Sequence, residues 1–187
     1  SFNLDHRIDD LALYKINHNQ FIIVVSGAWA QRASTFILKI SGGKAEIKKH
    51  KEIPHNDKTF SHGVFLLDDK IGICLVDGDF PRVEIEGNII ALPWGSKPTS
   101  AYYQKSTGEL FICCNHYSPA KQKTIDRPKS SFWHFTATSC QLKRIGTLEN
   151  CHTDKIQLHK GRIYYNNQYT NSLDSFKITK NQKGLPQ

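Results

Sequence analysis

The sequence lacks the features of a membrane-spanning protein and of a secreted, disulfide-rich one. No apolar run approaches the roughly 18 residues that cross a bilayer, and the first residues, SFNLDHRIDD, do not form a signal peptide. The five cysteines are odd in number and irregularly spaced, whereas a disulfide framework is normally even and denser. We therefore expect reduced thiols in a cytoplasmic protein that does not bind membranes. A cleaved signal would leave no trace, so secretion stays open.

Helix signals and catalytic signatures are absent too. No segment of about a dozen residues keeps apolar residues at positions i, i+3, i+4 and i+7. No Ser–His–Asp or Cys–His arrangement stands out, and no glycine-rich phosphate loop follows a strand. The adjacent Cys113 and Cys114 would point to opposite faces of a strand, so with His116 they fit no zinc-binding pattern. We expect neither a metal nor a cofactor.

What the sequence does contain is a repeated strand–turn–strand pattern. It occurs in LALYKINHNQFIIVV (11–25), HGVFLLDDKIGICLV (62–76), SAYYQKSTGELFICC (100–114) and DKIQLHKGRIYY (154–165). Each copy is a short alternating strand, a tight turn of Gly, Asp or Asn, and a more apolar strand, which are the signals of a β-hairpin. Two further strands follow each of the first three hairpins, whereas the fourth is followed by SFKITK (175–180) alone.

Units of four strands at intervals of roughly 40 to 50 residues resemble the blades of a β-propeller. The resemblance lies in the repeat pattern, because no motif that defines a WD40, kelch or hemopexin-like blade is matched. It implies that residues 1–187 form a single all-β propeller domain of about four blades. The repeats lie near residues 9–52, 61–94, 100–147 and 154–180.

The incomplete fourth repeat requires one more strand. Residues 1–8 alternate Phe2, Leu4 and Ile8 with polar residues, and an unpaired sheet edge costs backbone hydrogen bonds. We predict that these residues close the ring beside residues 175–179. Two alternatives remain: a β-sandwich with a similar number of strands, or part of a larger propeller that is cut or assembled as a dimer.

In a propeller, the loops after the second and fourth strand of each blade emerge on one face. Here those loops are long and rich in aromatic and basic residues, and long loops on a rigid scaffold are where binding residues concentrate. We predict a binding face made of Trp29, Arg32, His55, Lys58, Phe80, Arg82, Trp94, His116, Tyr117, Lys121, Lys123, Arg127, Lys129 and Tyr169.

A basic, aromatic face on a chain of net charge +8 indicates a non-catalytic protein-binding module that engages an acidic partner protein. Two alternatives belong to other classes. A phosphoesterase or nucleic-acid-acting enzyme would use His116 or His134, and HFTA (134–137) is similar to one half of the paired motifs of 2H phosphoesterases. A sugar-binding propeller lectin would stack a glycan on Trp29, Trp94 or Tyr169.

Overall fold

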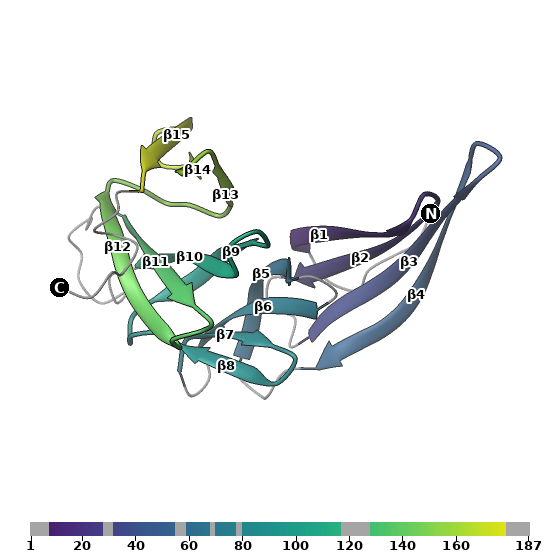
Figure 1. Ribbon diagram of the computed structural model, residues 1–187, viewed down its shortest axis with the longest axis horizontal. Helices are drawn as coiled ribbons and strands as arrows, with labels where there is room; N and C mark the ends of the chain where they lie inside the picture. The colour runs from purple at the N-terminus through teal and green to yellow at the C-terminus, as the bar shows by residue number, and fades with distance from the viewer. Residues whose placement is uncertain are drawn as a thin grey trace.

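The structure, a computed structural model, is built entirely of β-strands and turns in the residues that it describes, which are 8–27, 32–54, 59–67, 70–77, 80–116 and 128–178. No helix that could span a membrane is found in this part of the chain. The all-β prediction is therefore confirmed. The strands form four antiparallel sheets, each a meander of consecutive strands (Figure 1).

The first sheet consists of β1 (Ile8–Asn17), β2 (Gln20–Gly27), β3 (Arg32–Ser41) and β4 (Lys44–Pro54). The second consists of β5 (Thr59–Leu67), β6 (Lys70–Asp77), β7 (Arg82–Ile85) and β8 (Asn88–Ala91). The third consists of β9 (Lys97–Gln104), β10 (Glu109–His116), β11 (Lys129–Thr136) and β12 (Gln141–Glu149). The fourth consists of β13 (Ile156–His159), β14 (Arg162–Asn167) and β15 (Ser172–Lys177).

Tight turns join the paired strands, as the hairpin signals require. Lys160 and Gly161, between β13 and β14, both have positive φ angles, of 47° and 72°. This is the backbone of the two-residue turn whose twist matches that of the strands it joins. The register that follows pairs Leu158 with Ile163 and Ile156 with Tyr165, so that these four side chains share one face of the sheet.

Apolar side chains fill the space between successive sheets. Val24 of the first sheet packs with Ile73 and Leu75 of the second, and the second and third sheets meet in a similar cluster. Between the third and fourth sheets, Phe132 packs against Tyr165 at 5.5 Å between ring centroids. Each large side chain buried in this way contributes roughly 1.5–3 kcal/mol. The sheets are thus held by face-to-face packing, as in a propeller.

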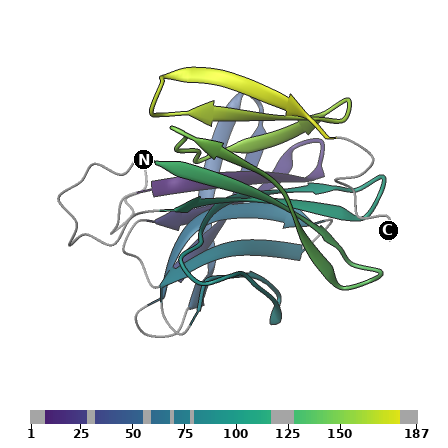
Figure 2. The ribbon, with the colours of Figure 1, turned by 90° about the vertical axis from the view of Figure 1, so that its left-hand side faces the viewer.

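The first strand of each sheet is its innermost one. β1 lies against β5, β5 against β9, and β9 against β13. The sheets fan out from these strands, with the first and fourth sheets at the two ends of an arc (Figure 1). In the view of Figure 2 the fourth sheet, coloured yellow to green, lies along the upper edge of the molecule.

The predicted closure by an N-terminal strand is not seen. Residues 1–7 lie outside the described part of the chain, and Ile8 pairs with Gly27 inside the first sheet. Among the described residues the four sheets form an open arc and not a ring. The coarser prediction of a propeller-like all-β fold holds, and the arrangement as four separate meanders is that of blades.

Candidate functional site

An ion pair joins three of the four sheets where the innermost strands converge. The ammonium of Lys155, just before β13, lies 2.6 and 2.9 Å from the two carboxylate oxygens of Asp10 on β1. Asp10 Oδ2 also accepts a hydrogen bond of 3.0 Å from the backbone N–H of Val64 on β5. The Asp10 side chain is only 12% exposed, so these charge-assisted bonds replace most of the water that the carboxylate loses. We call this region the axis.

Cys74, whose thiol is affected by the charge of this carboxylate, is inert. Burial, together with the negative charge of Asp10, raises the pKa of Cys74 well above its usual range. A thiol that stays protonated is neither a nucleophile nor a metal ligand. All five cysteines lie in the described part of the chain and none is in a disulfide.

Lys155 belongs to the loop of residues 150–155, whose backbone is fixed by a buried amide. Asn115, at the end of β10, donates to the carbonyl oxygen of Thr153 through Nδ2 and accepts from its N–H through Oδ1, both at 3.0 Å. The hydroxyl of Thr99 on β9 donates to the same carbonyl at 2.7 Å. All three residues are buried. A buried amide that satisfies a loop backbone in this way leaves the loop little freedom to move.

A second set of bonds holds the same loop from the fourth sheet. Asn167 accepts from the His152 N–H at 3.3 Å and donates to the Asn150 carbonyl at 3.1 Å. Asn166 accepts from the backbone N–H groups of Asp154 and Lys155, at 3.2 and 2.8 Å. The loop backbone is therefore anchored from both neighbouring sheets.

Three titratable side chains project from this anchored loop. His152 Nε2 lies 3.2 Å from Asp154 Oδ1, and Gln168 donates to the other oxygen of the same carboxylate. Both His152 and Asp154 remain partly exposed. A carboxylate that accepts from one ring nitrogen fixes the orientation of the imidazole and leaves the other nitrogen to face outward from the pair. Beside Lys155, the loop thus presents a base, a carboxylate and a cation within four consecutive residues.

The binding face predicted from the sequence is only partly described. Seven of its residues lie outside the described part of the chain: Trp29, His55, Lys58, Tyr117, Lys121, Lys123 and Arg127. The other seven are described: Arg32, Phe80, Arg82, Trp94, His116, Lys129 and Tyr169.

The basic members of the described part are paired within their own sheets. Arg82 is buried, lies 3.4 Å from Glu84, and stacks over the Phe80 ring at 5.5 Å. Arg32 lies 3.4 Å from Glu52, and Lys129 lies 3.1 Å from Glu149. These charges are neutralised locally and form no uniform basic patch.

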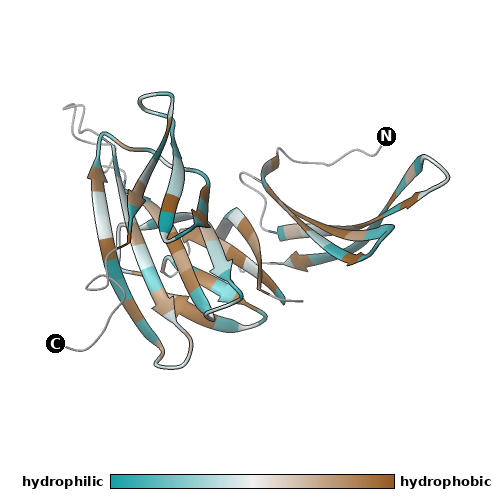
Figure 3. Ribbon diagram, turned by 45° about the horizontal axis from the view of Figure 1, so that its top comes forward, coloured by the Kyte–Doolittle hydropathy of each residue, from teal (hydrophilic) through white to brown (hydrophobic). Residues whose placement is uncertain are grey.

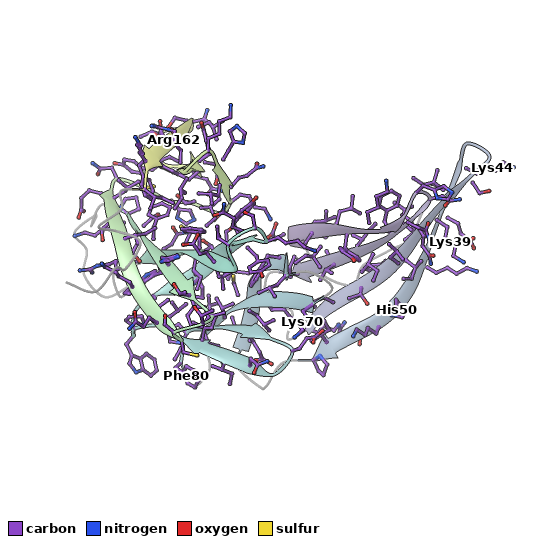
Figure 4. The ribbon with its side chains drawn as sticks, viewed as in Figure 1. Lys39, Lys44, His50, Lys70, Phe80 and Arg162 are labelled. Carbon is purple, nitrogen blue, oxygen red and sulfur yellow. The ribbon has the colours of Figure 1, made fainter. Side chains whose placement is uncertain are left out.

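The aromatic members differ in their exposure. Trp94 and Tyr169 are exposed, whereas Phe80 is half-buried beneath the Arg82 guanidinium. Figure 4 places Phe80 at the lower edge of the molecule, far from Arg162 on the fourth sheet. Phe80 in the β6–β7 loop and Tyr169 in the β14–β15 loop hold equivalent places in their sheets, whereas Trp29 and Tyr117 lie outside the described residues, so the lectin alternative stays a prediction.

His116 takes part in a structural cross-link. Its Nε2 lies 2.6 Å from the hydroxyl oxygen of Ser131, which also accepts a hydrogen bond of 2.9 Å from Trp133 Nε1. Burial lowers the pKa of His116, and a hydrogen bond with the backbone of Gly95 partly opposes this shift. The imidazole is therefore neutral at pH 7 and accepts from Ser131. Because Ser131 is only 1% exposed, its hydroxyl cannot reach a substrate.

His134 is a core histidine. It is buried, stacks on Phe111 at 5.0 Å between ring centroids, and lies 3.1 Å from Glu109. The β10–β11 register pairs His134 with Phe111 and Lys129 with His116, which places the two histidines on opposite faces of the sheet. The phosphoesterase alternative, which needed one or the other in an open site, is not supported by these positions.

Sequence reasoning missed the residues that meet at the axis. The loop that contains His152, Asp154 and Lys155 was expected among the long loops of one face, but its charged residues were not selected. One signal was available: Asn115 is a lone amide at the end of the apolar run LFICC, and a buried amide requires partners. Asp10 carried no signal, because its partner lies 145 residues away.

The similarities to known proteins are similarities of fold. No family model and no curated protein matches the chain. A solved structure of a protein from Lactobacillus plantarum is similar over 86% of this chain and 51% of its own, with 12% identity and a TM-score of 0.57. The periplasmic gluconolactonase of Pseudomonas aeruginosa is similar over 95% of this chain and 68% of its own, with 11% identity and a TM-score of 0.47.

These findings correct the prediction of a non-catalytic protein-binding module. The basic residues described on the predicted face are paired internally, and the loop of residues 150–155 presents His152, Asp154 and Lys155 on a backbone fixed by buried hydrogen bonds. At such low identity the likeness extends to fold alone. The chain has a propeller-like fold and spans about half the length of the Lactobacillus plantarum protein.

Proposed function

We propose that the axis is the site of a hydrolase that opens a cyclic ester of a polyhydroxylated acid, that is, a sugar lactone. The observation that carries the proposal is the loop of residues 150–155, which presents His152, Asp154 and Lys155 on a backbone fixed by buried hydrogen bonds. Such preorganisation is what acid–base catalysis requires. The choice of a lactone as substrate is suggested by the gluconolactonase among the proteins of similar fold. The choice of hydrolysis as the reaction rests on His152, Asp154 and Lys155.

His152 is the general base of the proposed reaction. Its Nε2 donates to Asp154, so Nδ1 is the nitrogen that takes a proton from the attacking water. The water oxygen bonds to the lactone carbonyl carbon and forms a tetrahedral intermediate. The ring C–O bond then breaks, and the proton held by His152 passes to the departing alkoxide, which gives a hydroxy acid. A positioned base of this kind contributes typically 10²–10⁴-fold in rate.

Lys155 supplies the positive charge for this reaction. An ammonium next to the carbonyl oxygen stabilises the negative charge that develops there in the tetrahedral intermediate. The two short contacts with Asp10 hold the Lys155 side chain at the axis, so it does not have to be ordered when substrate binds. Asp10 is a positioning residue in this scheme, because it acts through Lys155.

The test is the hydrolysis of glucono-1,5-lactone and of its 6-phosphate by the full chain. Proton release measures the rate of each reaction, which is compared with the rate of spontaneous hydrolysis. His152→Gln should lower kcat by about 10²-fold or more and leave the melting temperature close to that of the wild type. His50→Gln is the matched control, because His50 is an exposed histidine on β4 away from the innermost strands (Figure 4). It should leave the rate unchanged.

Two results would overturn the proposal. One is a wild-type protein that accelerates the hydrolysis of neither lactone. The other is a His152→Gln variant with the wild-type kcat, which would remove the proposed base from the mechanism.

A further inference from the structure

We propose that two copies of this chain join head to tail, the outer face of the first sheet of each copy packing against the outer face of the fourth sheet of the other. The outer face of the first sheet is its side turned away from the second sheet. The outer face of the fourth sheet is its side turned away from the third. The inference is argued from the outer faces and not from the proposed reaction, although Lys155, whose ammonium lies at the axis, also lines the hollow on the fourth sheet.

The first sheet has apolar side chains on both faces. One face is used within the chain, because Ala12, Ile22 and Val24 pack against the second sheet. The alternate residues point the other way: Leu11 is paired with Val25, and Leu13 with Ile23. In Figure 3 brown, hydrophobic bands alternate with paler and teal ones along the ribbons of this sheet.

The exposed part of this outer face lies on β1. Val25 on the neighbouring strand is already buried, whereas Leu13 is 54% exposed and Leu11 nearly as much. β1 is an innermost strand, and in the other sheets the corresponding strands lie against their neighbours. An innermost strand with a row of exposed leucines is expected where a further sheet packs on it.

The fourth sheet has an equivalent unused side. Ile163 and Tyr165 face the third sheet, and Tyr164 and Leu173 lie on the opposite face. A hollow of about 390 Å³ opens at this face; the outer-face residues Gln157, His159, Tyr164, Asn166 and Leu173 line it together with Lys155, Ile156 and Tyr165. Leu173 at its edge is 76% exposed.

The outer faces of the first and fourth sheets differ in shape, which favours contact between one face of each kind. The first presents two exposed leucines, Leu11 and Leu13, followed on the same face by Lys15, and the second presents a hollow with aromatic walls and a polar rim. A projecting aliphatic row fits a hollow better than it fits a second projecting row. The two faces also stand at opposite ends of the same arc (Figure 1).

A second copy is the occupant that satisfies both faces at once. When the first sheet of one copy meets the fourth sheet of the other, a two-fold axis generates the same contact a second time, and the assembly closes. The ring would then contain the four sheets of each copy. Two copies of this chain together have about the length of the Lactobacillus plantarum protein, because one copy covers 51% of that protein.

The experiment is the mass of the full chain in solution, measured by sedimentation velocity and light scattering over a range of concentrations. We expect twice 21.3 kDa for the wild type. Leu13→Glu places a charge in both junctions and should weaken association at least tenfold. Ile89→Glu is the matched control, because Ile89 on β8 is also 54% exposed but belongs to neither face, and it should stay dimeric.

Mixing two variants tests the head-to-tail arrangement itself. Leu13→Glu and Leu173→Glu should each be monomeric alone. Their equimolar mixture should recover dimer, because one junction then joins two unaltered faces while the other carries both charges. Circular dichroism of each variant establishes that it is folded, and Leu173→Glu by itself carries the test if Leu13→Glu does not fold.

Two outcomes would overturn the proposal. A wild type that is monomeric at every concentration leaves no role for a second copy. A Leu173→Glu variant that remains dimeric while Leu13→Glu is monomeric shows like faces pairing, which contradicts the head-to-tail contact.

Discussion

Asp10 and Lys155 lie 145 residues apart in the sequence and form an ion pair with N–O distances of 2.6 and 2.9 Å. The pair connects the first innermost strand to the loop that precedes the last one, and through the Val64 N–H it includes the second sheet. The two partners differ in their surroundings, because the Asp10 side chain is 12% exposed and that of Lys155 is 51% exposed. Losing one partner is therefore not equivalent to losing the other.

We predict that Lys155→Met costs more stability than Asp10→Asn. The lysine variant leaves a carboxylate largely buried and without its cation, which should cost about 2 kcal/mol. The asparagine variant keeps an oxygen for the Val64 N–H and leaves a lysine that water can solvate, so it should cost about 1 kcal/mol or less. Urea unfolding of both variants measures the difference. A larger loss for Asp10→Asn would contradict this account of the axis.

Asn115→Ala should destabilise the protein by about 2–3 kcal/mol, because it leaves both the N–H and the carbonyl of Thr153 with fewer buried partners. Asn88→Ala is the control, since Asn88 is exposed and makes one bond of 3.2 Å to the Ile85 carbonyl. It should cost about 0.5 kcal/mol. Denaturant unfolding provides both values, and equal losses would mean that the loop backbone does not depend on Asn115.

The fold class could be predicted because strand patterns are local. In β13 the buried Ile156 and Leu158 alternate with the exposed Gln157 and His159, and the turn that follows contains the glycine that such turns need. An alternation of this kind identifies a strand and its buried face from a few consecutive residues. It does not say how many sheets surround an axis, because that number depends on the angle between packed faces.

The site could not be predicted in the same way because its contacts are distant in sequence. Nothing in the residues around Asp10 indicates that Lys155 lies beside it. The described basic residues of the predicted face illustrate a related point: counting charges along the chain does not reveal that Lys129 meets Glu149 on the neighbouring strand, or that Arg82 is buried beside Glu84. Charge counts describe a surface correctly only when the pairs are known.

Gly63→Ala should destabilise the protein far more than Gly146→Ala. A Cβ on Gly63 would collide with the carbonyl oxygen of Thr99, which belongs to the backbone of the neighbouring innermost strand and cannot rotate away. A Cβ on Gly146 would meet the Phe176 ring at 3.9 Å, an ordinary contact. We expect a loss of about 1–3 kcal/mol for the first variant and little change for the second. Thermal unfolding compares them, and a Gly63→Ala protein as stable as the wild type would mean that β5 and β9 do not approach so closely.

The stability of the protein should fall as the pH is lowered below about 6.5, and His116 should account for part of the loss. Burial lowers the pKa of this histidine in the folded protein, while in the unfolded chain it titrates near its ordinary value of about 6.5. As the pH falls through 6.5, His116 binds a proton in the unfolded state but not yet in the folded state. The equilibrium therefore shifts toward unfolding until the pH passes the lower pKa of the folded protein. The contribution is fully present above pH 6.5 because the imidazole is then neutral in both states.

His116→Gln removes this titration, so its free energy of unfolding should decrease less than that of the wild type between pH 7.5 and pH 5. His18→Gln changes an exposed histidine in the β1–β2 turn and should retain the wild-type slope. The free energies of unfolding are measured with urea at each pH. If the His116→Gln protein loses as much stability as the wild type over this range, the imidazole does not remain neutral beside Ser131 in the folded state.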